Sequence, residues 1–154
     1  MKKFYLLTII KAGLTAGVCD ILAALLVYSV MMQKVPATQL LQSIASGVLG
    51  KAAYDGGVST ALLGVTLHFV IAMIWAIVYY FIYPMLGKLA QQPVISGLLY
   101  GAVVWLVMNL VVVPLSQIGF RPLTPQGVAI GMAILMVCIG LPIASIMHKR
   151  NRSR

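Results

Sequence analysis

Four long apolar runs, each nearly free of charged residues, constrain the fold of this chain more than any other feature of its sequence. They cover about residues 12–32, 58–83, 94–115 and 127–147. A helix needs roughly 20 apolar residues to cross the hydrocarbon core of a bilayer, where it satisfies all of its own backbone hydrogen bonds. The runs are continuous and lack the alternation of apolar and polar residues that marks membrane β-strands. The sequence therefore predicts an all-α membrane protein with four transmembrane helices.

The composition agrees with a single membrane-embedded unit. The 154 residues are 62% hydrophobic and only 8% charged, and their mean hydropathy is +1.04. About a quarter of the residues in a soluble domain are charged, so this chain has too few charges to cover a soluble surface. The length suits one domain, and we expect residues 1–154 to form it.

The distribution of basic residues predicts the orientation in the membrane. With four spans, both chain ends and the short connection around Lys88 share one side. That side carries eight of the eleven basic residues, which are Lys2, Lys3, Lys11, Lys88, Lys149, Arg150, Arg152 and Arg154. The other side carries Lys34, Lys51 and Arg121. Basic residues are in excess on the cytoplasmic side of membrane proteins, so we expect both termini to be cytoplasmic.

The net charge of +9 does not indicate nucleic-acid binding, because the basic residues lie at the chain ends and in short loops. The basic segment 148–154 is predicted to be a cytoplasmic tail that contacts anionic lipid headgroups. The expected partners are therefore the lipid bilayer and either further copies of this chain or another membrane protein.

Two features are predicted near the membrane surfaces. The first outer loop has apolar residues at helical spacing between about residues 38 and 50, which predicts a short amphipathic helix. A helix that lies on the surface and one that re-enters the membrane both fit this pattern. At the cytoplasmic end of the second run, an interfacial aromatic belt is predicted from Trp75, Tyr79, Tyr80 and Tyr83.

Three strongly polar residues, Asp20, His68 and Asn109, lie well inside the apolar runs. At 1.5 Å per residue, Asp20 and His68 lie roughly 12 and 15 Å from the starts of their spans, near the bilayer midplane. Asn109 lies roughly 22 Å along its span, in the outer half. Ionisable residues inside a membrane are costly and usually functional. We therefore take these three residues as candidate proton- or cation-binding groups, with Asp20 and His68 as a pair.

Small residues share the helical face of each polar residue. Such stripes are where membrane helices approach closely, so the polar residues are expected to face protein. The glycines predicted to pack helices together are Gly13, Gly17, Gly64, Gly97, Gly101, Gly127 and Gly131.

Several short motifs carry a resemblance to a known family. They are the segment His68-Phe-Val, the pair Tyr83-Pro84, the stretch GLLYG at residues 97–101, Asn109, and the pair Pro114-Leu115. With these motifs the chain resembles small multi-span bacterial inner-membrane proteins of uncharacterised function and is distantly similar to YagU-type proteins. The resemblance implies a bacterial inner-membrane location. In size and in the single acid of its first span, the chain also resembles small multidrug-resistance transporters. It differs from them in having Asp20 rather than Glu and a longer outer loop, so their mechanism is not transferred.

Two functions are compatible with these features of the sequence. No nucleophile with a matched base, no cluster of metal-ligand spacing and no cofactor motif is recognisable, so neither an enzyme nor a metal or other cofactor is predicted. The first function is a proton- or cation-linked transport or permeation unit that uses Asp20 and His68. The second is a structural or accessory membrane subunit whose polar residues lock helix packing.

Overall fold

The computed structural model describes residues 2–152, which are helical or in short loops, with no strand. The first span combines α1 (Lys2–Ala24) with the π-helical segment η1 (Leu25–Met31), and is followed by α2 (Ala37–Leu49) and the 3₁₀ segment η2 (Gly50–Tyr54). The second span is α3 (Gly57–Ile82), continued by the 3₁₀ segment η3 (Tyr83–Gln91). The third is α4 (Pro93–Val107), the π-helical η4 (Met108–Val112) and α5 (Val113–Leu115). The fourth is α6 (Pro125–Leu135), the π-helical η5 (Met136–Gly140) and α7 (Leu141–Arg152).

Four helical runs are long and apolar enough to cross a membrane: Leu6–Met31, Gly57–Gln91, Pro93–Leu115 and Pro125–Arg152. The predictions of an all-helical chain and of four such helices are confirmed. The boundaries differ, since the second helical run continues past the predicted end at residue 83 through η3 to Gln91. Pro84 is tolerated at the second position of this segment because a proline fits the first turn of a helix. The chain bends instead at Gly87, whose φ is 51°.

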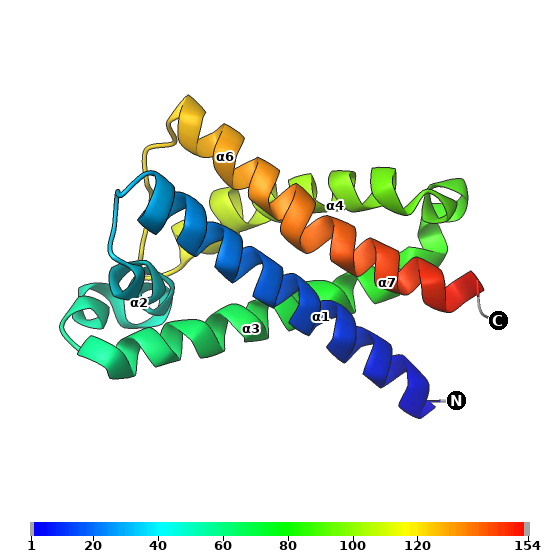
Figure 1. The fold of residues 1–154 in the computed structure, drawn as a ribbon, viewed down its shortest axis with the longest axis horizontal. Coiled ribbons are helices and arrows are strands. Elements are labelled where there is room, and N and C mark those ends of the chain that lie inside the picture. The colour runs from blue at the N-terminus through cyan, green and yellow to red at the C-terminus, as the bar shows by residue number, and fades with distance from the viewer. Residues whose placement is uncertain (1, 153–154) are drawn as a thin grey trace.

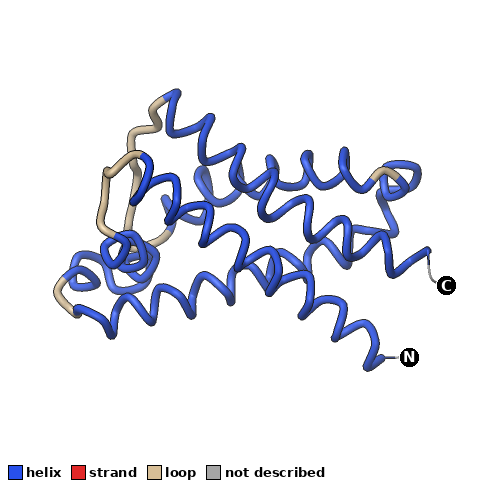
Figure 2. Tube along the Cα trace, viewed as in Figure 1, coloured by secondary structure: helices blue, strands red, loops and turns tan. Residues whose placement is uncertain are grey.

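The four spans lie side by side in two pairs. In the first pair α1 packs against α3, and in the second α4 packs against α6, η5 and α7. Contacts between α1 and α7 join the pairs. Figure 1 shows the N- and C-terminal ends together at one end of the bundle. Figure 2 shows most of the loops at the opposite end, which we call the loop end.

Helix α2 lies across the loop end of the bundle. It is seen almost end-on in Figure 1, where the spans run across the page, and it packs against α3. At the crossing, Gly64 of α3 lies directly against the carbonyl group of Leu41. The amide of Gln42 donates hydrogen bonds to the Gly57 carbonyl (3.0 Å) and to the Thr60 hydroxyl (3.3 Å). These contacts fix α2 against the first turns of α3.

An aromatic core fills the end of the bundle nearer the termini. Tyr79 of α3 is fully buried, and its ring centroid lies 4.7 Å from that of Tyr100 of α4. The Tyr79 hydroxyl donates to Ser96 Oγ at 3.1 Å, and the Tyr100 hydroxyl donates to the Trp75 carbonyl at 2.6 Å. The prediction that Tyr79 belongs to an interfacial aromatic belt is therefore wrong. Its ring packs against Tyr100 and its hydroxyl bonds to Ser96 inside the bundle.

Replacing Tyr100 by Phe is expected to lower the free energy of unfolding by about 1 kcal/mol, because it removes the hydrogen bond to Trp75 and keeps the ring contacts. Equilibrium unfolding in mixed detergent micelles, followed by circular dichroism, measures this change. The matched control is Tyr54→Phe at an exposed tyrosine, which should leave the stability unchanged. Equal effects of the two substitutions would show that the hydrogen bond from Tyr100 to Trp75 does not stabilise the fold.

Two of the three π-helical segments have an identifiable cause in the sequence. Pro114 follows η4, and Pro142 follows η5. A proline lacks an N–H group and clashes with the carbonyl four residues earlier, here that of Leu110 or Cys138, which lies inside the π-helical segment. The wider π-helical turn accommodates this carbonyl, and such turns are frequent at functional sites.

Candidate functional site

The three polar residues singled out in the sequence line one cavity. Asp20 of α1, His68 of α3 and Asn109 of η4 border a cavity of about 280 Å³, which we call the inner cavity. Apolar side chains make up most of its remaining wall, among them Ile71 and Leu135. The structure thus places the predicted acid, imidazole and amide around one common space within the bundle.

The pairing of Asp20 with His68 is close but is not a hydrogen bond. Nε2 of His68 lies 3.9 Å from Oδ2 of Asp20, and the two side chains are only 12% and 15% exposed. The same Nε2 lies 2.9 Å from the carbonyl oxygen of Gly17, one turn before Asp20. A carbonyl only accepts hydrogen bonds, so Nε2 carries a proton and donates it to Gly17. His68 therefore spans α1 and α3 and holds its ring beside the carboxyl group.

Asp20 also carries an unsatisfied oxygen. Within residues 2–152, Oδ1 of Asp20 is buried and has no hydrogen-bond partner, a condition that it shares only with the Ser29 hydroxyl. Buried polar atoms in proteins are almost always hydrogen-bonded, and an exception calls for a functional or ligand-based explanation. The carboxyl group of Asp20, which lines the inner cavity, therefore keeps one oxygen without a hydrogen-bond partner.

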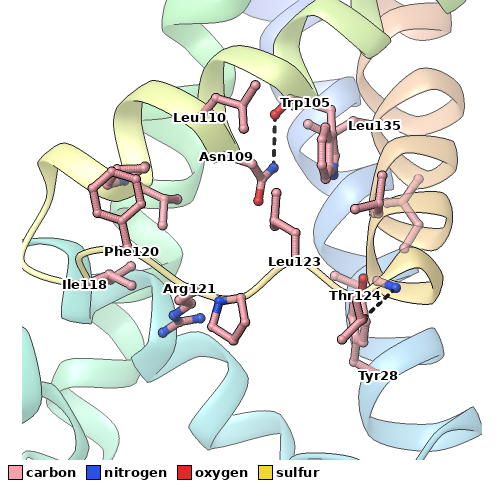
Figure 3. A pocket seen from close by; sticks show the side chains of 18 of the residues that line it. Tyr28, Trp105, Asn109, Leu110, Ile118, Phe120, Arg121, Leu123, Thr124 and Leu135 are labelled. Atoms are coloured by element: carbon pink, nitrogen blue, oxygen red, sulfur yellow. Dashed lines mark hydrogen bonds between the residues drawn. The ribbon is translucent and has the colours of Figure 1, made fainter.

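Asn109 is held by its own helix. Its Nδ2 donates to the carbonyl of Trp105 at 3.0 Å, across one turn. Figure 3 shows this bond and the amide oxygen turned into the cavity that adjoins Trp105. The side chain thus presents a neutral acceptor to that space.

Two further cavities continue from the inner cavity toward the loop end. The outer cavity, of about 440 Å³, shares Asp20 and Asn109 with the inner one and extends to Arg121 (Figure 3). The rim cavity, of about 470 Å³, is bordered by Lys34, Tyr54 and Arg121. Tyr28 of η1 lines all three cavities. A series of adjoining spaces therefore lies between the loops and Asp20.

The π-helical segments border this series of spaces. Tyr28 belongs to η1, Asn109 to η4 and Ile139 to η5, and each of them lines the inner cavity. Part of the wall of the inner cavity is therefore formed where the helices of three spans are locally widened.

Most of the predicted packing glycines lie at helix contacts. In α1, Gly13 faces Met73 and Gly17 faces Phe69, while Gly97 and Gly101 of α4 face Gly140 and Met136 of η5. Gly64 faces α2 rather than another span, and Gly131 faces the indole of Trp105. Gly127 differs, since a Cβ atom there would meet only Thr124 Oγ1, at 3.0 Å, within its own first turn.

Sequence reasoning missed four residues, which are Gly140, Tyr28, Lys34 and Arg121. Gly140 is as closely packed as Gly97, but no second glycine four residues away marks it. Tyr28 lies eight residues after Asp20, so helical spacing could have placed both on one face. The basic residues of the rim cavity, Lys34 and Arg121, come from loops, where no helical periodicity in the sequence indicates which way a side chain points.

The site offers acid–base and ion-binding chemistry without a metal cluster. In the part of the chain that the structure describes, no three His, Cys, Asp or Glu side chains gather as metal ligands. The arrangement can exchange a proton or hold a cation at Asp20, beside an imidazole and an amide oxygen. No family model, curated protein or solved structure matches the chain, so the proposals below rest on its own residues.

Proposed function

We propose that this protein is a proton- or cation-linked transport or permeation unit of a membrane. Asp20 carries the proton or cation, His68 tunes the carboxyl group through its charge, and Asn109 supplies a neutral acceptor. The observation that carries the proposal is the unpaired Oδ1 of Asp20 at the edge of the inner cavity.

The energetic argument concerns the cost of a bare carboxylate. An ionised Asp at the centre of a membrane helix costs about 3 kcal/mol on insertion scales. The contact with His68, at 3.9 Å, offsets part of this cost when the imidazole is charged. A proton or a cation that reaches Oδ1 through the cavities removes the remaining cost. Ionised Asp20 therefore favours binding of a proton or a cation.

The proposed setting is the bacterial inner membrane, with both termini in the cytoplasm and α2 as an amphipathic helix at the outer surface. The common position of the two termini at one end of the bundle supports this orientation (Figure 1). At that end the Arg150 guanidinium donates to Thr8 Oγ1 at 2.7 Å, and His148 Nδ1 lies 3.0 Å from the Ala90 carbonyl. We propose that the basic segment contacts anionic headgroups there. We also propose that the protein works as a homo-oligomer.

Infrared difference spectroscopy of the purified protein in lipid tests whether Asp20 exchanges protons. The carboxyl band of Asp20 is expected to change with the pH of the surrounding solution, and the Asp20→Asn variant identifies the band. Removal of the imidazole in His68→Ala is expected to move the midpoint of this change, because the neighbouring charge is lost. A band that stays constant with pH, with and without His68, would rule out a proton site that is accessible from solution.

A structural role is the second candidate, and the hydrogen bond of His68 favours it. His68 of α3 bonds to the backbone carbonyl of Gly17 in α1, as polar residues that lock helix packing do. On this view Asp20→Asn, which keeps the size of the side chain, changes neither stability nor activity. The transport proposal expects the same substitution to leave the fold intact and to remove the activity.

A further inference from the structure

Two basic residues from distant loops line the same cavity. Lys34 follows the first span and Arg121 precedes the fourth, yet both border the rim cavity. Arg121 also lines the outer cavity, which reaches Asp20. The loop end has only three basic residues in all, and the third, Lys51, lines neither cavity.

Hydrogen bonds hold both loops in place. The backbone N–H of Lys34 donates to the Tyr28 carbonyl at 3.0 Å, at the end of the first span. In the other loop, the N–H of Gln117 donates to the Gly47 carbonyl at 3.0 Å, and Thr124 Oγ1 accepts from the N–H of Gly127 at 3.1 Å. The positions from which the two basic side chains extend are therefore fixed relative to the bundle.

Neither basic side chain is neutralised by the protein. Among residues 2–152, no ion pair involves Lys34 or Arg121, and the acid of that end, Asp55, does not reach them. A cleft lined by charges of one sign concentrates ions of the opposite sign. The rim cavity therefore attracts anions, and of the two charges proposed for Asp20 it favours a proton over a metal cation. Arginine in addition binds carboxylate and phosphate groups through two parallel hydrogen bonds.

The walls behind these charges are mainly apolar. Leu123, Leu135 and Trp105 line the outer cavity, and its volume of about 440 Å³ falls within the range of small-molecule sites. We infer that the outer and rim cavities form a recognition site for a small organic anion. Its acidic group lies between Lys34 and Arg121, and its apolar part lies against these walls.

This inference deepens the proposed function by naming the class of cargo, and its consequence for transport rests on that function. An anion held at Arg121 and a proton held at Asp20 occupy adjoining cavities and together carry no net charge. Their joint movement avoids the electrical cost of moving either ion alone through the membrane. Binding of the anion itself requires no transport and is tested separately.

Quenching of tryptophan fluorescence tests the anion site directly. The chain has two tryptophans, and Trp75→Phe leaves only Trp105, which lines the outer cavity. In phosphatidylcholine nanodiscs at low salt, iodide is expected to quench Trp105 more strongly than caesium does. Lys34→Gln combined with Arg121→Gln is expected to lower the iodide quenching constant about threefold. Quenching by neutral acrylamide should stay the same. Lys51→Gln in the Trp75→Phe protein should leave the iodide quenching constant unchanged.

Two outcomes overturn the inference, and the first of them needs no substitution of Lys34 or Arg121. Caesium quenching equal to or stronger than iodide quenching in the Trp75→Phe protein overturns it. The same follows if the neutral variant is quenched by iodide as the parent is. The charge-keeping variant Lys34→Arg with Arg121→Lys should retain the iodide effect if charge is the cause.

Two further arms identify the source of the anion. Benzoate added to phosphatidylcholine nanodiscs is expected to protect Trp105 from iodide, and only when Lys34 and Arg121 are present. In nanodiscs that contain phosphatidylglycerol, protection without added benzoate would assign the site to a lipid headgroup. The proposed proton site of Asp20 fails or survives independently, because its infrared band is measured without any of these anions.

Discussion

Proteoliposomes that contain the Asp20→Asn variant are expected to show at least about a tenfold lower proton flux than those with the unsubstituted protein. Asn has nearly the size of Asp and can still form hydrogen bonds, but its amide cannot take up and release a proton near neutral pH. An imposed pH gradient drives the flux, valinomycin with equal potassium on both sides holds the membrane potential at zero, and a trapped pH-sensitive dye reports the flux. Vesicles without protein give the baseline.

The chain offers a matched control for this substitution. Asp55 is the other of its two acidic residues, and it is exposed at the loop end. Asp55→Asn removes the same charge without touching the cavity, so its flux should equal that of the parent. If Asp20→Asn retains the flux while its circular dichroism and stability match the parent, Asp20 does not carry the proton. An unsubstituted protein with no flux above baseline would equally defeat the transport proposal.

Replacing Gly140 by Ala is expected to have the largest effect on stability, lowering the free energy of unfolding by about 3 kcal/mol. A Cβ atom on Gly140 would overlap the backbone of Gly97, and one on Gly97 would lie 2.8 Å from the carbonyl oxygen of Gly140. Backbone atoms on both sides leave no flexible side chain that can move aside. Equilibrium unfolding in mixed micelles measures the loss.

The matched control for Gly140→Ala is Gly47→Ala in α2. A Cβ atom at Gly47 meets its nearest neighbour, Ile118 Cδ1, at an ordinary 3.9 Å. Because Ala favours a helix over Gly by up to about 1 kcal/mol, this substitution should be neutral or stabilising. Similar changes in the two variants would show that the contact between η5 and α4 is looser than these distances indicate.

The sequence was sufficient for the number of spans but not for their ends. The thickness of the bilayer sets the length of an apolar run, so four runs indicate four helices. It sets no limit on a helix that continues into water or headgroups, and α7 accordingly extends to Arg152. The π-helical segments were also not predicted, although Pro114 and Pro142 are visible in the sequence. A proline shows where the hydrogen-bond ladder is disturbed but not how the helix adapts.

The polar residues of the site were predictable because membranes penalise them. Asp20, His68 and Asn109 stand out in apolar runs, and similar depth suggests that Asp20 and His68 meet. The loop residues Lys34 and Arg121 carry no such signal, since basic residues are ordinary outside the hydrocarbon. Their convergence depends on hydrogen bonds such as that of Gln117 to Gly47, which join segments about 70 residues apart.

The contact of His68 with both Gly17 and Asp20 has a consequence for the biogenesis of the protein. Domains that are made first fold first during synthesis, and spans enter the membrane in chain order. Asp20 therefore meets its imidazole neighbour as soon as α3 is inserted, before Asn109, Arg121 or any cavity exists. The hairpin of α1 and α3 thus contains the histidine that stabilises Asp20. It can therefore remain in the bilayer before α4 and α6 are inserted.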